Sequence, residues 1–462
     1  MINIQNFNSL VKNATSPLTA EARRTALTLV EAAVSSVDPK YLVQKRVQLV
    51  GHELKIDGLR IDLADYRRVI VVGAGKASGA MAEALEYILG SYIETGLVNV
   101  PKGTAGKHRT RNIKLHEAGH PTPDEKGMEG AEKIAMLLEN LTPQTLVISL
   151  LSGGGSALLP LPKTGISLSD KKVTTNILMR SGATIEEINT VRKHLSALKG
   201  GQLATRAYPA TLISLILSDV VGDPLQSIAS GPTVPDPTTF RDAVEILQRY
   251  NIWDQIPDAV RKTLRDGLQG GIPETPKPSD ARIANVHNVL LGNNRVALDA
   301  ASDKASSLNL SPLILSSFLE GEARHVGTVF AGLAREMQTS GSHISKYDVI
   351  LAGGETTVTV TGKGRGGRNQ ELVLSASVRL KELDGIALAS VGTDGVDGLS
   401  NAAGAIVDGY TINRAYELKI NPFTYLANND SNTFFSMLGD EIITGPTGTN
   451  VNDILIMVNL KK

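Results

Sequence analysis

The chain has 462 residues, and Lys plus Arg equal Asp plus Glu at 47 each. This balance excludes the strong basic field that attracts nucleic acids, and an aromatic content of 4% offers few platforms for base stacking. The absence of cysteine excludes disulfides, iron–sulfur clusters, cysteine-ligated zinc and a thiol nucleophile. At roughly 100–200 residues per domain, this length predicts two or three domains, and we expect two.

The N-terminal stretch, MINIQNFNSLVKNATS, contains neither a basic start nor an apolar run, so it does not resemble a secretory signal. No segment approaches the roughly 18 consecutive apolar residues of a membrane-spanning helix. We therefore expect a cytoplasmic protein that acts on small molecules, with neither a nucleic acid nor a membrane as its partner.

The predicted elements begin with a helix over residues 20–36, where apolar residues recur at helical spacing. Near Arg67, the segment RRVIVVGAGKASGAMAEALEYIL changes from an apolar strand to a Gly-rich turn and then to a helix. The same order begins again at residues 145–159, residues 211–232, IANVHNVLLGNNRVALDAASDKA, YDVILAGGETTVTV and GIALASVGTDGVDG. Such repeats predict an α/β fold with mainly parallel sheets that helices cover on both faces, and such sheets bind ligands at the carboxyl ends of their strands.

A segment without periodicity, DGLQGGIPETPKPSD at residues 266–280, separates two series of strands and helices. Its Gly, Pro and polar residues are typical of a linker. We therefore predict an N-terminal Rossmann-like α/β domain over residues 1–275 and a C-terminal α/β domain over residues 281–462.

The first Gly-rich turn, GAGKASG, places Gly73 and Gly75 at the end of a strand and Lys76 at the start of a helix, where backbone N–H groups favour an anion. The spacing matches neither a Walker A loop nor a dinucleotide fingerprint. An anion site and a tight turn with a solvated lysine both stay open.

Two further loops follow apolar strands. In LSGGGSALLP, three glycines between two serines predict a cradle for phosphate or carboxylate, and a plain turn is the alternative. These residues are Ser152, Gly153, Gly154, Gly155 and Ser156. Asp219, in ILSDVVGDP, is placed to hold a cation or to accept a proton, and helix capping is its alternative.

The segment GGETTVTVTGKGRGGRNQ is too polar and too rich in glycine for core packing. Arg368 and Asn369 begin a predicted helix directly after Gly366 and Gly367, an arrangement that suits an oxyanion. Upstream, Glu355 follows a strand, and Asp394 lies in the later loop SVGTDGVDG. For such acids, a divalent metal with phosphate and ordinary turn chemistry are both open.

Two of the eight histidines, His120 and His194, have distinctive surroundings, and no pair has the spacing of a zinc site. Arg192 and His194 lie on one predicted helix and are candidates for contact with a substrate. For a single histidine, a structural role is the alternative.

Eight blocks between residues 67 and 453 together resemble the type II glycerate kinases, whose C-terminal half carries the MOFRL motif. They are VVGAGKA, EAGHPTPDE, LLSGGGSALL, SGATIEEINTVRKHLSALKGGQLA, LILSDVVGDPLQSIASGP, GGETTVTVTGKGRGGRNQELVLSA, SVGTDGVDGLSNAAGAIVDG and ITGPTGTNVNDI. Their common order is more specific than any single loop. Residues 1–60 and 266–280 match the family little.

The resemblance implies two α/β domains with a cleft between them, and transfer of the ATP γ-phosphate to D-glycerate, which gives 2-phosphoglycerate. It also implies that Lys76 and Arg368 correspond to the family's cleft lysine and arginine. With that activity, the Gly-rich loops would bind phosphate, and Mg2+ would take its ligands from Glu355, Asp219 and Asp394. Asp219 is also a catalytic candidate, and Arg192, His194 and Asn369 are the candidates for binding substrate.

Two other functions stay open. Some relatives of the family are called hydroxypyruvate reductases, although the dinucleotide fingerprint of an NAD(P)H-dependent enzyme is missing here. A non-catalytic protein that binds nucleotides or sugar acids is the third alternative. The sequence decides neither which acid accepts the hydroxyl proton nor whether the protein is a homodimer.

Overall fold

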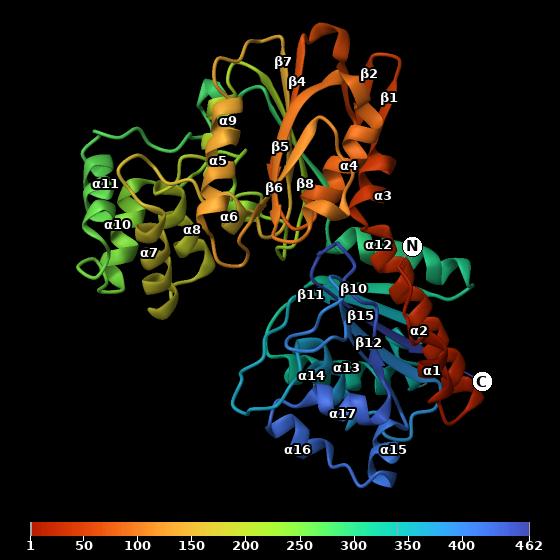
Figure 1. Cartoon of the computed structure of the whole chain (residues 1–462). Helices are drawn as coiled ribbons and strands as arrows, with labels where there is room; N and C mark the ends of the chain where they lie inside the picture. The colour runs from red at the N-terminus through yellow and green to blue at the C-terminus, as the bar shows by residue number, and fades with distance from the viewer. Residues whose placement is uncertain (1, 340, 462) are drawn as a thin grey trace. The chain divides into compact units, whose positions relative to one another are not determined.

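The computed structural model describes residues 2–339 and 341–461, and Figure 1 shows its helices and strands. The chain forms two compact units. Unit 1 comprises residues 1–38 and 292–462, and unit 2 comprises residues 39–291. None of the helices in the described part of the chain combines the length and the apolar character needed to cross a membrane.

Unit 2 contains a six-stranded sheet in the order β6-β5-β4-β7-β8-β9. The pairings from β6 through β8 are all parallel. The strands are β4 (Arg68–Ala74), β5 (Ile93–Pro101), β6 (Ile113–Ala118), β7 (Thr145–Leu151), β8 (Thr211–Leu217) and β9 (Val286–Gly292). A separate antiparallel sheet contains β1 (Val47–Val50), β2 (Glu53–Ile56) and β3 (Leu59–Asp62).

Helices cover both faces of the parallel sheet, as the sequence predicts. Ile70 and Val72 of β4 pack in a core with residues of α5 (Glu125–Leu137) and α9 (Gln202–Ala207). Figure 1 shows α4 (Ser78–Leu89) on the other side of the sheet from α5. Residues alternate between the two faces along a strand, so a run such as RVIVVGA is apolar throughout because both faces are buried.

A group of helices with its own core adjoins the short helix α6 (Gly155–Leu158), and Figure 1 shows these helices together. The group consists of α7 (Leu168–Arg180), α8 (Ile185–His194), α10 (Phe240–Arg249) and α11 (Asp258–Leu268). Helix α3 (Pro39–Arg46) begins unit 2 and packs against α4.

Unit 1 also contains a six-stranded sheet, in the order β10-β11-β15-β12-β13-β14. Only β10 and β11 pair in parallel, whereas β15 is antiparallel to both β11 and β12. The strands are β10 (Pro312–Leu319), β11 (Val349–Gly354), β12 (Ile386–Gly392), β13 (Gly404–Asp408), β14 (Glu441–Ile442) and β15 (Asp453–Asn459). The α/β fold is confirmed, but this sheet is mixed rather than mainly parallel.

The helices of unit 1 lie on both faces of its sheet (Figure 1). One face packs against α13 (Ala323–Gln338), α14 (Arg368–Ser377) and α17 (Ser431–Leu438), and the other against α2 (Pro17–Ser36) and α12 (Asn294–Ser307). The remaining helices are α1 (Phe7–Lys12), α15 (Thr411–Glu417) and α16 (Pro422–Ala427).

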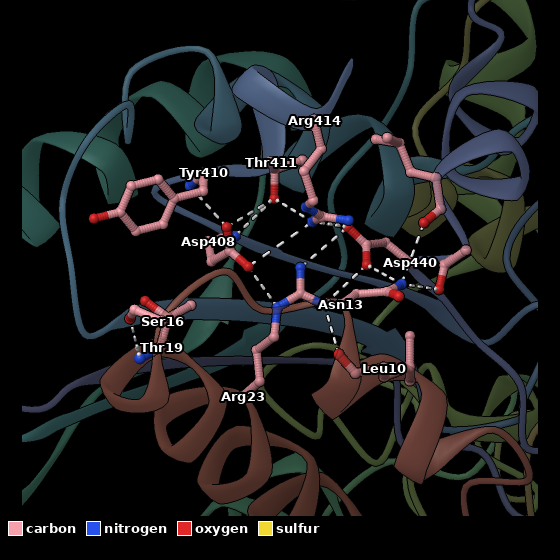
Figure 2. A network of polar contacts seen from close by, with 12 residues as sticks. Leu10, Asn13, Ser16, Thr19, Arg23, Asp408, Tyr410, Thr411, Arg414 and Asp440 are labelled. Carbon is pink, nitrogen blue, oxygen red and sulfur yellow. Dashed lines mark hydrogen bonds and ion pairs between the residues drawn. The ribbon is translucent and has the colours of Figure 1, made fainter. Parts of the chain in front are cut away.

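The units meet after residue 38 and after residue 291, whereas the predicted domains meet at residues 275–281. Residues 1–38 belong with the C-terminal residues because α2 packs on β12 and β15, where it buries Arg23 completely. Figure 2 shows how Arg23 joins this helix to the sheet: its Nε donates to Asp408 (2.5 Å) and its Nη1 to Asp440 (2.8 Å). The apparent linker is also packed within unit 2, because Glu274 accepts the backbone N–H of Phe240 (2.8 Å).

Candidate active-site residues

Several predicted residues of unit 2 lie at the carboxyl ends of its parallel strands. Lys76 follows β4, and its backbone N–H donates to the carbonyl of Gly153 (2.8 Å), in the loop after β7. Asp219 follows β8 and lies beside the same loop, since a Cβ added to Gly153 would lie 1.9 Å from its Oδ2. The sheet therefore brings Lys76, residues 153–155 and Asp219 together, which is where parallel sheets bind ligands.

His120, which follows β6, belongs to the same edge. A Cβ on Gly154 would lie 2.8 Å from its Nε2 and 3.3 Å from Cγ of Lys76. Burial lowers the pKa of His120, and the positive charge of Lys76 lowers it further. At neutral pH this histidine is therefore mainly uncharged, so it offers one donor and one acceptor.

The predicted glycines all have neighbours within the chain that exclude a side chain. A Cβ at any of them would lie within 2.8 Å of another atom. They are Gly73, Gly75, Gly153, Gly154, Gly155, Gly366 and Gly367. Gly154 in addition has a φ of +80°, which L-residues adopt at a cost. Packing thus accounts for these glycines whether or not a phosphate binds beside them.

The two serines of the predicted cradle differ in their surroundings. Ser152 is buried, and its hydroxyl accepts the backbone N–H of Ala77 (3.0 Å) ahead of α4. Ser156 is partly exposed and lines a cavity of about 470 Å3, while its Oγ lies 2.7 Å from Oγ of Ser230. Of the two serines, Ser156 is the one that lines this cavity.

The cavity of about 470 Å3, which we call the cation cavity, also contains a group that the sequence analysis missed. Arg192 lines it, as expected of a substrate-binding candidate, and Lys171, Lys172 and Lys199 line it as well. Lys171 was not singled out because a lysine on a helix is usually solvated, and the same holds for Lys199 in a loop. Their spacing in the sequence gives no signal that they meet.

His194 does not line this cavity. It is completely buried against Phe240, with Nδ1 2.8 Å from the carbonyl of Thr190 and Nε2 3.2 Å from Oε2 of Glu274. Both ring nitrogens therefore have partners within the chain, and His194 has the structural role that was the alternative to substrate binding.

In unit 1, a second cavity of about 790 Å3 is lined by the predicted residues Glu355, Gly366, Gly367, Arg368 and Asp394. Arg368 begins α14, and its side chain lies between two acids. Its Nε and Nη2 donate to Asp453 (2.5 and 3.0 Å), and its Nη1 donates to Glu355 (2.8 Å). These bonds use three of the five N–H groups of a guanidinium and fix its plane.

Asp453 is a further residue that the sequence analysis missed. Burial raises its pKa to about 6, although the adjacent Arg368 and the amide of Asn369 act in the opposite direction. Asn369 itself is buried, and its Nδ2 donates to Asp453 (3.0 Å) and to Asp397 (3.3 Å). The side-chain amide of Asn369, which was predicted to contact the substrate, therefore holds the acids around Arg368 in this structure.

Asp397 holds the start of α14 in place. Its carboxylate accepts the backbone N–H groups of Asn369 (3.1 Å) and Gln370 (2.9 Å). A carboxylate at this position satisfies N–H groups that the helix leaves unpaired and interacts favourably with the helix dipole. The loop and the helix that carry Arg368 are thereby made rigid.

The predicted metal ligands are divided between the two units. Glu355 and Asp394 line one cavity in unit 1, whereas Asp219 belongs to unit 2. Within residues 2–339 and 341–461, no group of three or more His, Asp or Glu side chains is arranged to hold a metal ion. Mg2+ is commonly held by one or two carboxylates together with substrate phosphates and water, so Glu355 and Asp394 fit that role.

Two family models match the chain. Residues 25–265 match a domain of unknown function, DUF4147, and residues 348–453 match the MOFRL family. The first match begins inside α2, so it runs across the boundary between the two units.

Relatives match almost the whole chain. A protein of Pyrococcus horikoshii named glycerate 2-kinase is 43% identical, over 96% of this chain and 98% of its own length. A protein of Agrobacterium vitis named putative hydroxypyruvate reductase is also 43% identical, over 94% and 93%. The solved structure of a glycerate kinase from Thermotoga maritima is 38% identical, covers 95% of this chain and 99% of its own, and superimposes with a TM-score of 0.85. The chain belongs to the glycerate kinase family that carries the DUF4147 and MOFRL domains.

Proposed function

We propose that the protein transfers the γ-phosphoryl group of ATP to the hydroxyl on carbon 2 of D-glycerate, giving ADP and 2-phosphoglycerate. The observation that carries the proposal is the near-complete match to a relative named glycerate 2-kinase, which covers 96% of this chain. The geometry supports it, because two cavities that each contain cationic side chains suit two anionic substrates.

In this proposal the protein supplies position and charge rather than covalent chemistry. Lys76 and Arg368 each stabilise negative charge that develops on oxygen during the transfer. Arg368 is suited to this role because its plane is fixed by Asp453 and Glu355 before a substrate arrives. His120 and Ser156 add neutral hydrogen-bonding groups around Lys76 and the cation cavity.

Mg2+ is part of the same proposal, with Glu355 and Asp394 as its protein ligands. When bound, the ion would neutralise charge on the phosphate oxygens of the donor. Asp219, beside Gly153, is then the acid of unit 2 that remains as a candidate to accept the proton of the hydroxyl. We place the reaction in the cytoplasm.

The test is a single set of assays on the purified protein. With ATP, MgCl2 and D-glycerate, ADP should form, and phosphorus NMR of the product should show 2-phosphoglycerate. L-glycerate serves as the control for the acceptor. A 3-phosphoglycerate signal alone would contradict the assigned position of transfer.

The name of the Agrobacterium vitis relative makes reduction of hydroxypyruvate the second candidate. The same preparation is therefore mixed with hydroxypyruvate and NADH or NADPH, without ATP. We expect no change in absorbance at the nicotinamide band, because the one G-x-G-x-x-G run, at residues 362–367, does not directly follow a strand: β11 ends at Gly354. Steady oxidation of the coenzyme without ATP would reverse the ranking of the two functions.

A further inference from the structure

The cation cavity of unit 2 brings together four basic side chains from three separate segments. Lys171 and the partly exposed Lys172 come from α7, Arg192 from α8, and Lys199 from the loop before α9. Lys171 is 8% exposed and Lys199 is 2% exposed, so both are nearly removed from bulk water. Lysines are rarely buried to this extent unless a partner balances their charge.

The partners that the chain provides for these groups are neutral. The ammonium group of Lys171 donates to the carbonyl of Pro160 (3.0 Å), and that of Lys199 donates to the carbonyl of Leu159. None of these four cations forms an ion pair with a carboxylate in the described part of the chain. The next residue after Arg192 shows the contrast, because buried Lys193 pairs with Asp236 (3.3 Å).

This arrangement is costly without a ligand. Burial, together with the charge of Arg192, lowers the pKa of Lys171 to about 7. Burial also lowers the pKa of Lys199 well below its ordinary value, and the neighbouring Lys171 and Arg192 lower it further. A multiply charged anion would remove the repulsion and restore the protonated forms of both lysines.

The shape and the remaining lining of the cavity indicate which kind of anion fits. At about 470 Å3 it has the size of a small-molecule site. Beside the cations, the lining offers neutral donors and acceptors from His120, Ser156, Thr175 and Asn176, together with apolar surface from prolines, Leu168 and Met179. Glycerate carries one carboxylate and is small for such a space, whereas a chain of phosphates matches several cations at once.

We propose that the cation cavity binds the phosphate chain of the nucleoside triphosphate, with Lys171, Arg192 and Lys199 as its charged contacts. The inference rests on the proposed function in one respect, namely that the donor is a nucleotide. It goes beyond that function because it assigns the donor's phosphates to this cavity and assigns two lysines that the sequence did not indicate.

The direct test measures binding of inorganic tripolyphosphate by calorimetry at pH 7, without glycerate, nucleotide or Mg2+. Lys171→Met and Lys199→Met should each weaken binding about tenfold to a hundredfold, the usual effect of one hydrogen bond to a charged group. Lys262→Met, which changes an exposed lysine on the nearby α11, is the matched control and should bind as the wild type does.

A second measurement does not depend on how the variants fold. In the wild-type protein, tripolyphosphate should protect Lys171 from an amine-specific acylating reagent, as mapped by mass spectrometry, whereas glycerate should not. Lys171→Arg keeps the positive charge and should retain more of the affinity than Lys171→Met.

The proposal is overturned if tripolyphosphate binds both Met variants as tightly as the wild type, or if glycerate rather than tripolyphosphate protects Lys171. Its failure is distinct from failure of the proposed function. A protein that phosphorylates D-glycerate normally with either Met variant would keep the function and lose this assignment. A protein that binds tripolyphosphate through these lysines but transfers no phosphate to glycerate would do the reverse.

Discussion

Two regions of the molecule bury positive charge in opposite ways. In unit 1, Arg23 is surrounded by two completely buried carboxylates, Asp408 and Asp440, and Figure 2 shows Arg414 beside them. In the cation cavity of unit 2, the partners of Lys171 and Lys199 among the described residues are backbone carbonyls. The first set of charges is balanced within the chain and serves the fold, whereas the second is balanced only when an anion binds.

Arg368 is intermediate between these two cases. It has two acidic partners, as Arg23 does, but its side chain is 33% exposed and lines a cavity. Its pKa is raised above the ordinary value: burial opposes this, and Asp453 and Glu355 outweigh it. Arg368 is therefore held in place by the fold and is still accessible to a substrate.

The largest effect on stability is expected at Arg23. Arg23→Met leaves Asp408 and Asp440 buried with fewer partners, and removing one member of a buried ion pair typically costs about 3–5 kcal/mol. Urea unfolding should show this loss, while kcat/KM of the protein that remains folded should be unchanged. Arg24→Met is the control, since the neighbouring Arg24 is exposed and should change stability by less than about 0.5 kcal/mol. A loss below about 1 kcal/mol at Arg23 would mean that Arg414 alone balances both acids.

The next effect concerns catalysis at Arg368. Arg368→Ala should lower kcat/KM for D-glycerate by on the order of 10²–10³, as loss of one preorganised donor does. It should also reduce stability, because Asp453 is buried and loses its main counter-charge. Adding Asp453→Asn should restore part of the stability and none of the activity.

Arg365→Ala is the matched control for Arg368, because Arg365 lies in the same Gly-rich loop but is exposed. Its guanidinium makes one long contact, to the carbonyl of Leu399 (3.4 Å). Near-normal turnover in Arg368→Ala, or an equal loss in Arg365→Ala, would remove the catalytic role of Arg368.

Lys76 should show a similar loss of turnover without a loss of stability. Its side chain is exposed, and the hydrogen bond that anchors the residue comes from its backbone N–H, which Lys76→Ala retains. We expect kcat/KM to fall by on the order of 10²–10³, with unfolding changed by less than about 0.5 kcal/mol.

Lys102→Ala is the control for Lys76. Lys102 is an exposed lysine just after β5, and its backbone N–H is likewise held by a carbonyl, that of Ala118 (3.0 Å). If the two alanine variants have the same kinetics, Lys76 is a solvated lysine in a tight turn, the alternative that the sequence left open.

Much of the fold could be predicted from local patterns. The strand, turn and helix around Gly73 follow from an apolar run that changes to helical spacing, and the structure contains them as β4 and α4. The domain boundary could not be found in this way. It depends on where the apolar face of α2 packs, and the sheet strands that it meets lie more than 300 residues further along the chain.

The site shows the same division between local and long-range information. Lys76, Glu355 and Arg368 were predicted because each lies in a Gly-rich loop at a strand or helix end. Asp453 was missed because it is the first residue of its strand, and in a parallel sheet that end lies away from the ligand. The antiparallel β15 instead places Asp453 opposite Gly354 and Gly392, the last residues of β11 and β12.

The smallest expected effect is the change of stability with pH, and it tests the contrast between the two regions. Lys171 has a pKa of about 7 in the folded protein and an ordinary value of 10.5 when unfolded. Between these values the unfolded chain binds a proton that the folded protein does not, so stability rises with pH by at most about 1.4 kcal/mol per unit. Below pH 7 both states bind the proton, and this group contributes no slope.

Urea unfolding of the wild type and of Lys171→Met, measured from pH 6 to pH 9, tests this expectation. The variant should be the more stable of the two at pH 6, and its advantage should shrink as the pH rises, because Met never carries the charge whose burial is costly. Saturating tripolyphosphate should flatten the slope of the wild type, since a bound anion keeps Lys171 protonated. Arg23→Met, in which a charge balanced by acids is removed, should give a curve parallel to the wild type over the same range. Parallel curves for Lys171→Met as well would mean that Lys171 is charged and balanced without a ligand, and the distinction between the two regions would then be lost.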